Sequence, residues 1–93
     1  MRDIKRSSKF KKQFRKILKS TNYFDFEIRF NLILNLLRND IELQIQYRDH
    51  ALVGNFAGFR ECHLKPDLLL IYRKVDDDLL WLEQIGSHAE VFG

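Results

Sequence analysis

The 93-residue sequence predicts an α+β fold in which a helical hairpin packs on a mostly antiparallel sheet. The first half of the chain contains two stretches with apolar residues at helical spacing, and the second half contains three apolar segments separated by turn residues. A short segment around Ile4 precedes the first helix and supplies an additional strand. The expected order of elements is therefore β-α-α-β-β-β, within a single domain that spans residues 1–93.

The first predicted helix begins after Ser7 and Ser8, whose hydroxyl groups are suited to cap a helix. Its apolar face comprises Phe10, Phe14, Ile17 and Leu18. The pattern breaks at Ser20, Thr21 and Asn22. A second helix is expected from about Asp25 to Arg38, because apolar residues recur there at intervals of three and four.

The polar face of the first helix is a basic stripe that consists of Lys9, Lys12, Lys16 and Lys19. Residues 1–20 contain nine Lys or Arg and one Asp, whereas residues 21–93 contain seven Lys or Arg and twelve acidic residues. A stripe of this kind is either a solvated helix face or a surface for a polyphosphate partner. Composition alone supports the two interpretations about equally.

Three strands are expected in the second half, at residues 58–64, 68–74 and 79–85, with turns at Pro66-Asp67 and at residues 76–78. Residues 68–72 are apolar on both faces, which is typical of a central strand. Alternation along the last strand places Gln84 on one face with Leu80 and Leu82. Residues 41–55 lack periodicity and are expected to form a long loop, a feature that is often functional.

Several classes of function are excluded or made improbable by composition. The longest apolar run, residues 68–72, is too short to span a bilayer, and the charged N-terminus does not resemble a secretory signal, so we expect a cytoplasmic protein with no membrane partner. Cys62 is the single cysteine, which excludes an internal disulfide. Gly54 and Gly58 are isolated and do not form a nucleotide-binding loop.

Three histidines and one aspartate are candidates for proton transfer near neutral pH: His50, His63, Asp67 and His88. A tight turn at Pro66 places His63 and Asp67 at the same end of one hairpin. Gly86 permits a sharp turn that carries His88 back over the sheet. No pair of histidines has the close spacing of metal ligands, so no metal or other cofactor is expected. The alternative is that each histidine is an ordinary structural residue.

Four segments in this order resemble the YafQ-type branch of the RelE toxin superfamily: YRDHALVG at 47–54, FRECHLKPD at 59–67, IY at 71–72 and GSHAEVFG at 86–93. The resemblance implies a microbial RNase fold and a metal-independent endoribonuclease that cleaves messenger RNA in the ribosomal A site and so inhibits translation. It also implies an acidic antitoxin as partner, with operator DNA contacted only through the antitoxin.

In such enzymes the 2′-hydroxyl of the RNA is the nucleophile, so the protein supplies a base, an acid and stabilisation of the phosphorane. The resemblance implies that His88 is the general acid, that Asp67 or His50 is the base, and that His63 positions or stabilises charge. The resemblance implies that Phe92 stacks on a base, whereas the residues alone favour a hydrophobic plug for the sheet edge.

The family commonly has arginine where this chain has Gln84, and often tryptophan where it has Leu68. The loss of that arginine removes a positive charge from beside the scissile phosphate, which Lys65, Arg48 or Arg60 could replace. The sequence leaves two alternative functions open. One is an inactive toxin-like module that binds an antitoxin and acts as a DNA corepressor, and the other is a gyrase inhibitor of the ParE type.

Overall fold

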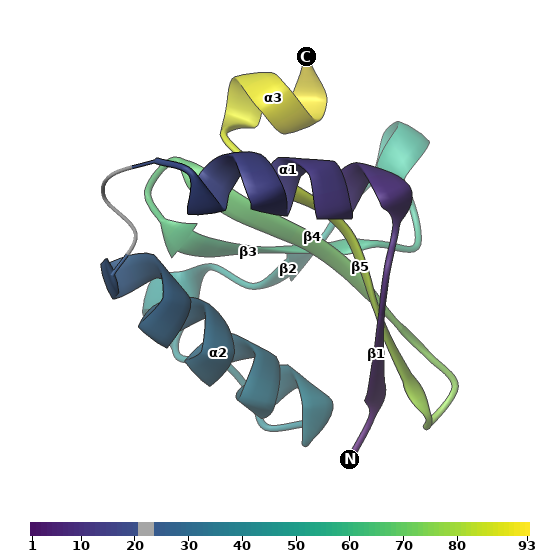
Figure 1. Ribbon diagram of the computed structural model, residues 1–93. Helices are drawn as coiled ribbons and strands as arrows, with labels where there is room; N and C mark the ends of the chain where they lie inside the picture. The colour runs from purple at the N-terminus through teal and green to yellow at the C-terminus, as the bar shows by residue number, and fades with distance from the viewer. Residues whose placement is uncertain (21–23) are drawn as a thin grey trace.

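The computed structural model describes residues 1–20 and 24–93 and confirms the α+β class (Figure 1). Its sheet has the strand order β1-β5-β4-β3-β2. The strands are β1 Asp3–Arg6, β2 His50–Ala51, β3 Arg60–Lys65, β4 Leu68–Val75 and β5 Leu79–Gly86. The α-helices are α1 Ser8–Leu18, α2 Phe24–Arg38 and α3 His88–Phe92, and two single 3₁₀ turns, η1 Ile45–Tyr47 and η2 Gly54–Phe56, lie in the connection before β3.

The predicted order is correct for β1, α1, α2, β3, β4 and β5 but omits two short elements. Strand β2 contains two residues, too few to show an alternating pattern, and it lies in the segment that was expected to be a loop. Helix α3 contains five residues. The predicted break between the long helices includes Thr21 and Asn22, which lie outside the described residues.

The two long helices cover one face of the sheet and form the main core with it (Figure 1). Ser7 caps α1 as predicted, because its hydroxyl oxygen accepts a hydrogen bond from the Phe10 backbone amide at 2.9 Å. Aromatic rings of both helices then contact one another; those of Phe14 and Phe30 have centroids 5.0 Å apart. Below them, β4 is the central strand, as predicted, with residues 69–72 buried.

The pairing of β5 with β4 contains a register shift that changes which residues share a face. Tyr72 pairs with Leu82, whereas Ile71 pairs with Gln84, so Glu83 is an extra residue in β5. Because paired residues lie on the same face and successive residues alternate, Gln84 lies on the face opposite to that of Leu82. The prediction that Gln84 shares a face with Leu80 and Leu82 is therefore wrong, and the bulge is the reason.

Strand β1 pairs with β5 in parallel, whereas the other neighbouring strands of this sheet are antiparallel, and side-chain contacts anchor the start of β1. The buried Arg2 side chain donates to Asp40 Oδ1 at 2.9 Å and to the Asp76 carbonyl at 2.6 Å. Lys74 Nζ lies 2.7 Å from the same Asp40 oxygen. The hydrogen bond from Lys74, followed by that from Arg2, holds the pKa of Asp40 below its usual range.

We expect Asp40→Asn to lower the free energy of unfolding at neutral pH. Asparagine tolerates the positive φ of 56° at this position, so the change removes charge without adding backbone strain. A carboxylate with a lowered folded-state pKa stabilises the fold above its unfolded pKa, and this contribution is lost as the pH falls through the folded pKa. Urea unfolding from neutral pH to about pH 2 should show the two proteins converging in acid.

The matched control is Asp77→Asn, at an exposed position in the turn between β4 and β5. It should follow the wild type at every pH. A pH-independent difference between Asp40→Asn and the wild type would show that the carboxylate charge does not anchor β1.

None of the helices in the described part of the chain is both long and apolar enough to cross a bilayer.

Candidate active site

The sheet face opposite the long helices carries a row of side chains that runs across neighbouring strands. His50 of β2 pairs with Glu61 of β3, which pairs with Ile71 of β4, which in turn pairs with Gln84 of β5. His63 lies two residues after Glu61 on β3 and therefore points to the same side. The fold thus brings together two predicted histidines and Gln84, which the bulge in β5 turns toward this face.

His88 reaches the same face because α3 begins directly after β5. The Ser87 hydroxyl oxygen accepts from the Glu90 amide at 3.2 Å, and the Glu90 carboxylate accepts from the Ser87 amide at 2.9 Å, which is a capping box. A Cβ atom at position 86 would lie 3.2 Å from Glu90 Cβ. A side chain at position 86 would crowd that of Glu90, so Gly86 favours the close approach of α3 to the end of β5, and its φ is not positive.

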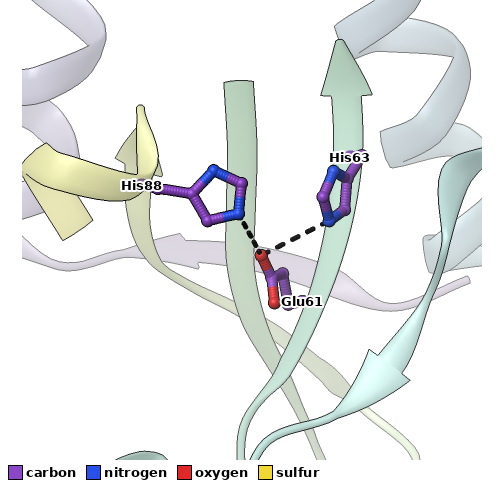
Figure 2. A group of neighbouring side chains, drawn as sticks. All are labelled: Glu61, His63 and His88. Atoms are coloured by element: carbon purple, nitrogen blue, oxygen red, sulfur yellow. Dashed lines mark ion pairs between the residues drawn. The ribbon is translucent and has the colours of Figure 1, made fainter. Parts of the chain in front are cut away.

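His88 is held by Asp67 from the turn between β3 and β4. Asp67 Oδ1 accepts from the His88 backbone amide at 2.9 Å and lies 2.8 Å from His88 Nδ1. These two bonds, with the backbone amide contributing most, keep the pKa of Asp67 below its usual range. The carboxylate therefore stays ionised and fixes the ring, whose Nε2 atom points toward β3 (Figure 2).

Glu61 lies at the centre of the cluster and was not predicted from the sequence. Its Oε2 atom is 3.0 Å from His50 Nε2. Its Oε1 atom is 3.5 Å from His63 Nε2 and 4.0 Å from His88 Nε2 (Figure 2). The side chain is buried, and Oε1 has no hydrogen-bond partner. The sequence could have indicated Glu61 as a site residue, because it lies two residues before His63 in a strand and alternate residues of a strand share a face.

The other ring nitrogen of His50 is also paired. Its Nδ1 atom lies 2.6 Å from the Arg48 carbonyl oxygen, and Arg48 adopts a left-handed conformation with φ 49° at the end of η1. Because a carbonyl oxygen only accepts, Nδ1 carries a proton and Nε2 is the atom that binds or releases one. Glu61 Oε2 lies beside that nitrogen.

A cleft of about 300 Å³ opens beside His63 and is lined by cationic and aromatic side chains. Arg29, Arg48 and Lys65 supply the positive charge, and Tyr47 supplies a ring. Arg29 also donates to the Leu64 carbonyl at 2.8 Å, which fixes α2 against β3. An anion that enters this cleft lies next to the histidine cluster.

Arg60 and Gln84, two of the residues predicted to contact RNA, have other partners. Arg60 follows the parity opposite to Glu61, and its Nε atom donates to Asp49 at 3.2 Å. Asp49 also accepts from the Tyr72 hydroxyl at 2.5 Å. Arg60 therefore belongs to a network on the sheet face that the long helices cover. Gln84 is buried, and its Oε1 atom accepts from Gln13 of α1 at 3.1 Å.

Phe92 and the basic stripe lie around the cluster. Phe92 is 43% exposed, its ring centroid lies 6.3 Å from that of His88, and it meets Phe56 edge to face at 5.2 Å. The stripe residues Lys9, Lys12, Lys16 and Lys19 are exposed along α1. Lys16 Nζ lies 3.3 Å from Glu90, so the stripe adjoins α3.

A helical hairpin on one face of the sheet and an imidazole–carboxylate cluster on the other agree with the RelE-like fold of small bacterial toxins, to which solved YafQ structures are similar. A family model described as "Bacterial toxin of type II toxin-antitoxin system, YafQ" matches residues 2–93. The chain belongs to the YafQ family of toxins, and its partner class is accordingly an antitoxin.

Individual members of this family are similar to the chain over nearly its whole length. The mRNA interferase toxin YafQ of Escherichia coli strain K12 is 37% identical over 92 residues, which are 99% of this chain and 97% of the relative. The crystal structure of a metal-bound toxin from Helicobacter pylori is 41% identical, with a TM-score of 0.86 and coverage of 99% and 100% of the two chains. The YafQ chain in an E. coli DinJ–YafQ complex is 35% identical, with a TM-score of 0.83 and full coverage of both chains.

Proposed function

We propose that this chain, acting as a single domain in the cytoplasm, is an endoribonuclease that cleaves messenger RNA in the ribosomal A site and so inhibits translation. The observation that carries the proposal is the cluster of His50, His63 and His88 around Glu61, beside a cationic cleft. The name of the E. coli relative, an mRNA interferase, supports the same activity.

The reaction requires that the 2′-hydroxyl loses a proton as its oxygen attacks phosphorus, and that the 5′-oxygen gains a proton as the P–O bond breaks. His50 fits the role of base, because its Nδ1 proton is held by Arg48 and Glu61 stabilises the imidazolium that forms at Nε2. His88 fits the role of acid, with Asp67 as the group that orients it. The products are a 2′,3′-cyclic phosphate and a free 5′-hydroxyl.

The remaining predicted residues bind the substrate. His63 lies between the other two histidines and borders the cleft, so it is placed to contact a phosphate oxygen together with Lys65. Phe92 offers an exposed ring beside His88 for a neighbouring base. The lysine stripe, outside the catalytic cluster, faces ribosomal RNA.

The test is cleavage of a defined messenger by the purified protein, with and without programmed ribosomes, mapped by primer extension. We expect cuts within the A-site codon that require ribosomes, with His50→Ala giving a rate lower by about 10²-fold or more. A folded protein that cuts nothing would favour the antitoxin-binding module, and inhibition of gyrase in a parallel supercoiling assay would favour the ParE-type alternative.

An acidic antitoxin is the proposed partner of this chain, in keeping with the DinJ–YafQ complex of the E. coli relative. Its charge would complement the lysine stripe, and operator DNA would be contacted through the antitoxin. Production of the toxin alone should arrest growth, and co-production of the acidic protein encoded beside it should restore growth. Unimpaired growth without the partner, at a toxin level confirmed by immunoblot, would contradict the proposal.

A further inference from the structure

We propose that single-stranded RNA binds a second row of side chains on the sheet face that carries the histidine cluster. This alternating row consists of Lys5, Trp81, Arg73 and Phe59. In the reaction proposed above, it holds nucleotides of the messenger that flank the scissile phosphate. The part of the row in cleavage rests on the proposed function, whereas its binding of RNA does not.

The alternating row crosses four neighbouring strands of the sheet. Lys5 of β1 pairs with Trp81 of β5, and Trp81 pairs with Arg73 of β4. Phe59 directly precedes β3, and the guanidinium carbon of Arg73 lies 5.0 Å from the centroid of its ring. Because paired residues of a sheet share a face, cationic and aromatic side chains alternate along this row.

The position of the row along the strands places it next to the histidine cluster. Phe59 lies two residues before Glu61, and Arg73 lies two residues after Ile71, so all four point to the same side of the sheet. Glu61 and Ile71 pair with each other in the row that begins with His50. Two residues of a strand span about 7 Å, so RNA that passes the cluster comes directly onto the alternating row.

The side chains of the row are accessible and are held in place by their neighbours. Lys5 and Arg73 are exposed, and Trp81 and Phe59 are partly exposed. The cation–π contact with Phe59 orients the plane of the Arg73 guanidinium. Trp81 Nε1 donates to Glu83 Oε2 at 2.6 Å, which fixes the indole ring and engages the acidic group beside it.

The chemistry of the row matches an unpaired RNA strand. Bases of single-stranded RNA stack on aromatic rings and on the guanidinium planes of arginine, and cations contact the phosphates between them. Trp81 and Arg73 are the stacking surfaces, and Lys5 contacts a phosphate. An acidic protein segment would match the two positive charges, but the alternation with rings and the position beside the histidine cluster favour RNA.

Trp81 is the single tryptophan of the chain, so its fluorescence reports whether RNA lies on the row. The first experiment titrates the purified protein with a single-stranded 2′-O-methyl oligoribonucleotide of about ten nucleotides, which lacks the nucleophile for cleavage. We expect saturable quenching of the tryptophan fluorescence. The quenching should persist when the lysine stripe of α1 is changed to glutamine, because RNA held only by the stripe does not contact Trp81.

The second experiment measures the affinity of variants from the fluorescence anisotropy of a labelled copy of this oligonucleotide. Arg73→Gln and Trp81→Leu should each bind at least about ten-fold more weakly than the wild type, because each removes a stacking surface. Lys5→Gln should also bind more weakly. Its matched control is Arg6→Gln, which removes the same charge from the next, exposed residue on the other side of β1 and should change the affinity less. Circular dichroism shows whether each variant is folded.

Absence of saturable quenching in the folded wild type would overturn the row as an RNA surface, as would equal affinity in the wild type, Arg73→Gln and Trp81→Leu. Loss of antitoxin binding by these variants, with unchanged RNA affinity, would assign the row to the antitoxin instead. The proposed function fails separately. A toxin that binds RNA on the row but never cleaves messenger on ribosomes contradicts the nuclease and leaves the binding surface in place.

Discussion

Replacing His88 by alanine should lower the single-turnover rate of messenger cleavage by on the order of 10²–10⁴-fold, the usual contribution of a general acid. The fold should survive, because the ring is half exposed and the backbone amide still bonds to Asp67. The measurement is cleavage on programmed ribosomes with toxin in excess, accompanied by thermal unfolding. Binding to ribosomes should change little.

Asp77→Ala is a suitable control for the loss at His88. It removes a side chain from the exposed turn between β4 and β5, remote from the cluster, and should cleave at the wild-type rate. Wild-type cleavage by His88→Ala would remove this residue from the mechanism. Slow cleavage by both variants would point to a general loss of folded protein.

Neutralising the lysine stripe by changing Lys9, Lys12, Lys16 and Lys19 to glutamine should weaken ribosome binding by on the order of 10²-fold near physiological salt. Each lysine that neutralises a phosphate releases a counterion, so the dependence of affinity on salt should also become shallower. The four side chains are exposed, and the Lys16–Glu90 ion pair lies at the surface, so stability should change little.

The control for the stripe is the matching set of four lysine-to-arginine changes, which retains every charge. We expect this variant to bind with the wild-type salt dependence. Once each protein is saturated with ribosomes, the glutamine variant should cleave at the wild-type rate, because the stripe lies outside the cluster. An unchanged salt dependence in the glutamine variant would identify the stripe as a solvated helix face.

The sequence predicted the fold class, the long elements, the central position of β4 and the toxin family, because each depends on a pattern that extends over many residues. It also predicted that His63 and Asp67 lie at the same end of one hairpin and that His88 turns back over the sheet. The bond of 2.8 Å between Asp67 and His88 was not predicted from the sequence. The catalytic roles of these residues stay predictions.

The parts that the sequence did not predict depend on single residues. One extra residue, Glu83, reverses the orientation of Gln84, and nothing in an apolar strand pattern marks such a bulge. Glu61 resembles any polar residue of a half-buried strand until the register places it opposite His50. Helix α3 was detectable, because Ser87 and Glu90 have the spacing of a capping box.

The parallel pairing of β1 with β5 constrains the order in which the chain folds. Strands β3, β4 and β5 are joined by tight turns and can assemble through local contacts, whereas Asp3 pairs with Leu79 across most of the sequence. Closure of so long a segment costs chain entropy before any contact compensates for it. We therefore expect the first strand and its Arg2 anchor to join the sheet late. During synthesis, the amino-terminal residues leave the ribosome before the residues of β5 that they pair with.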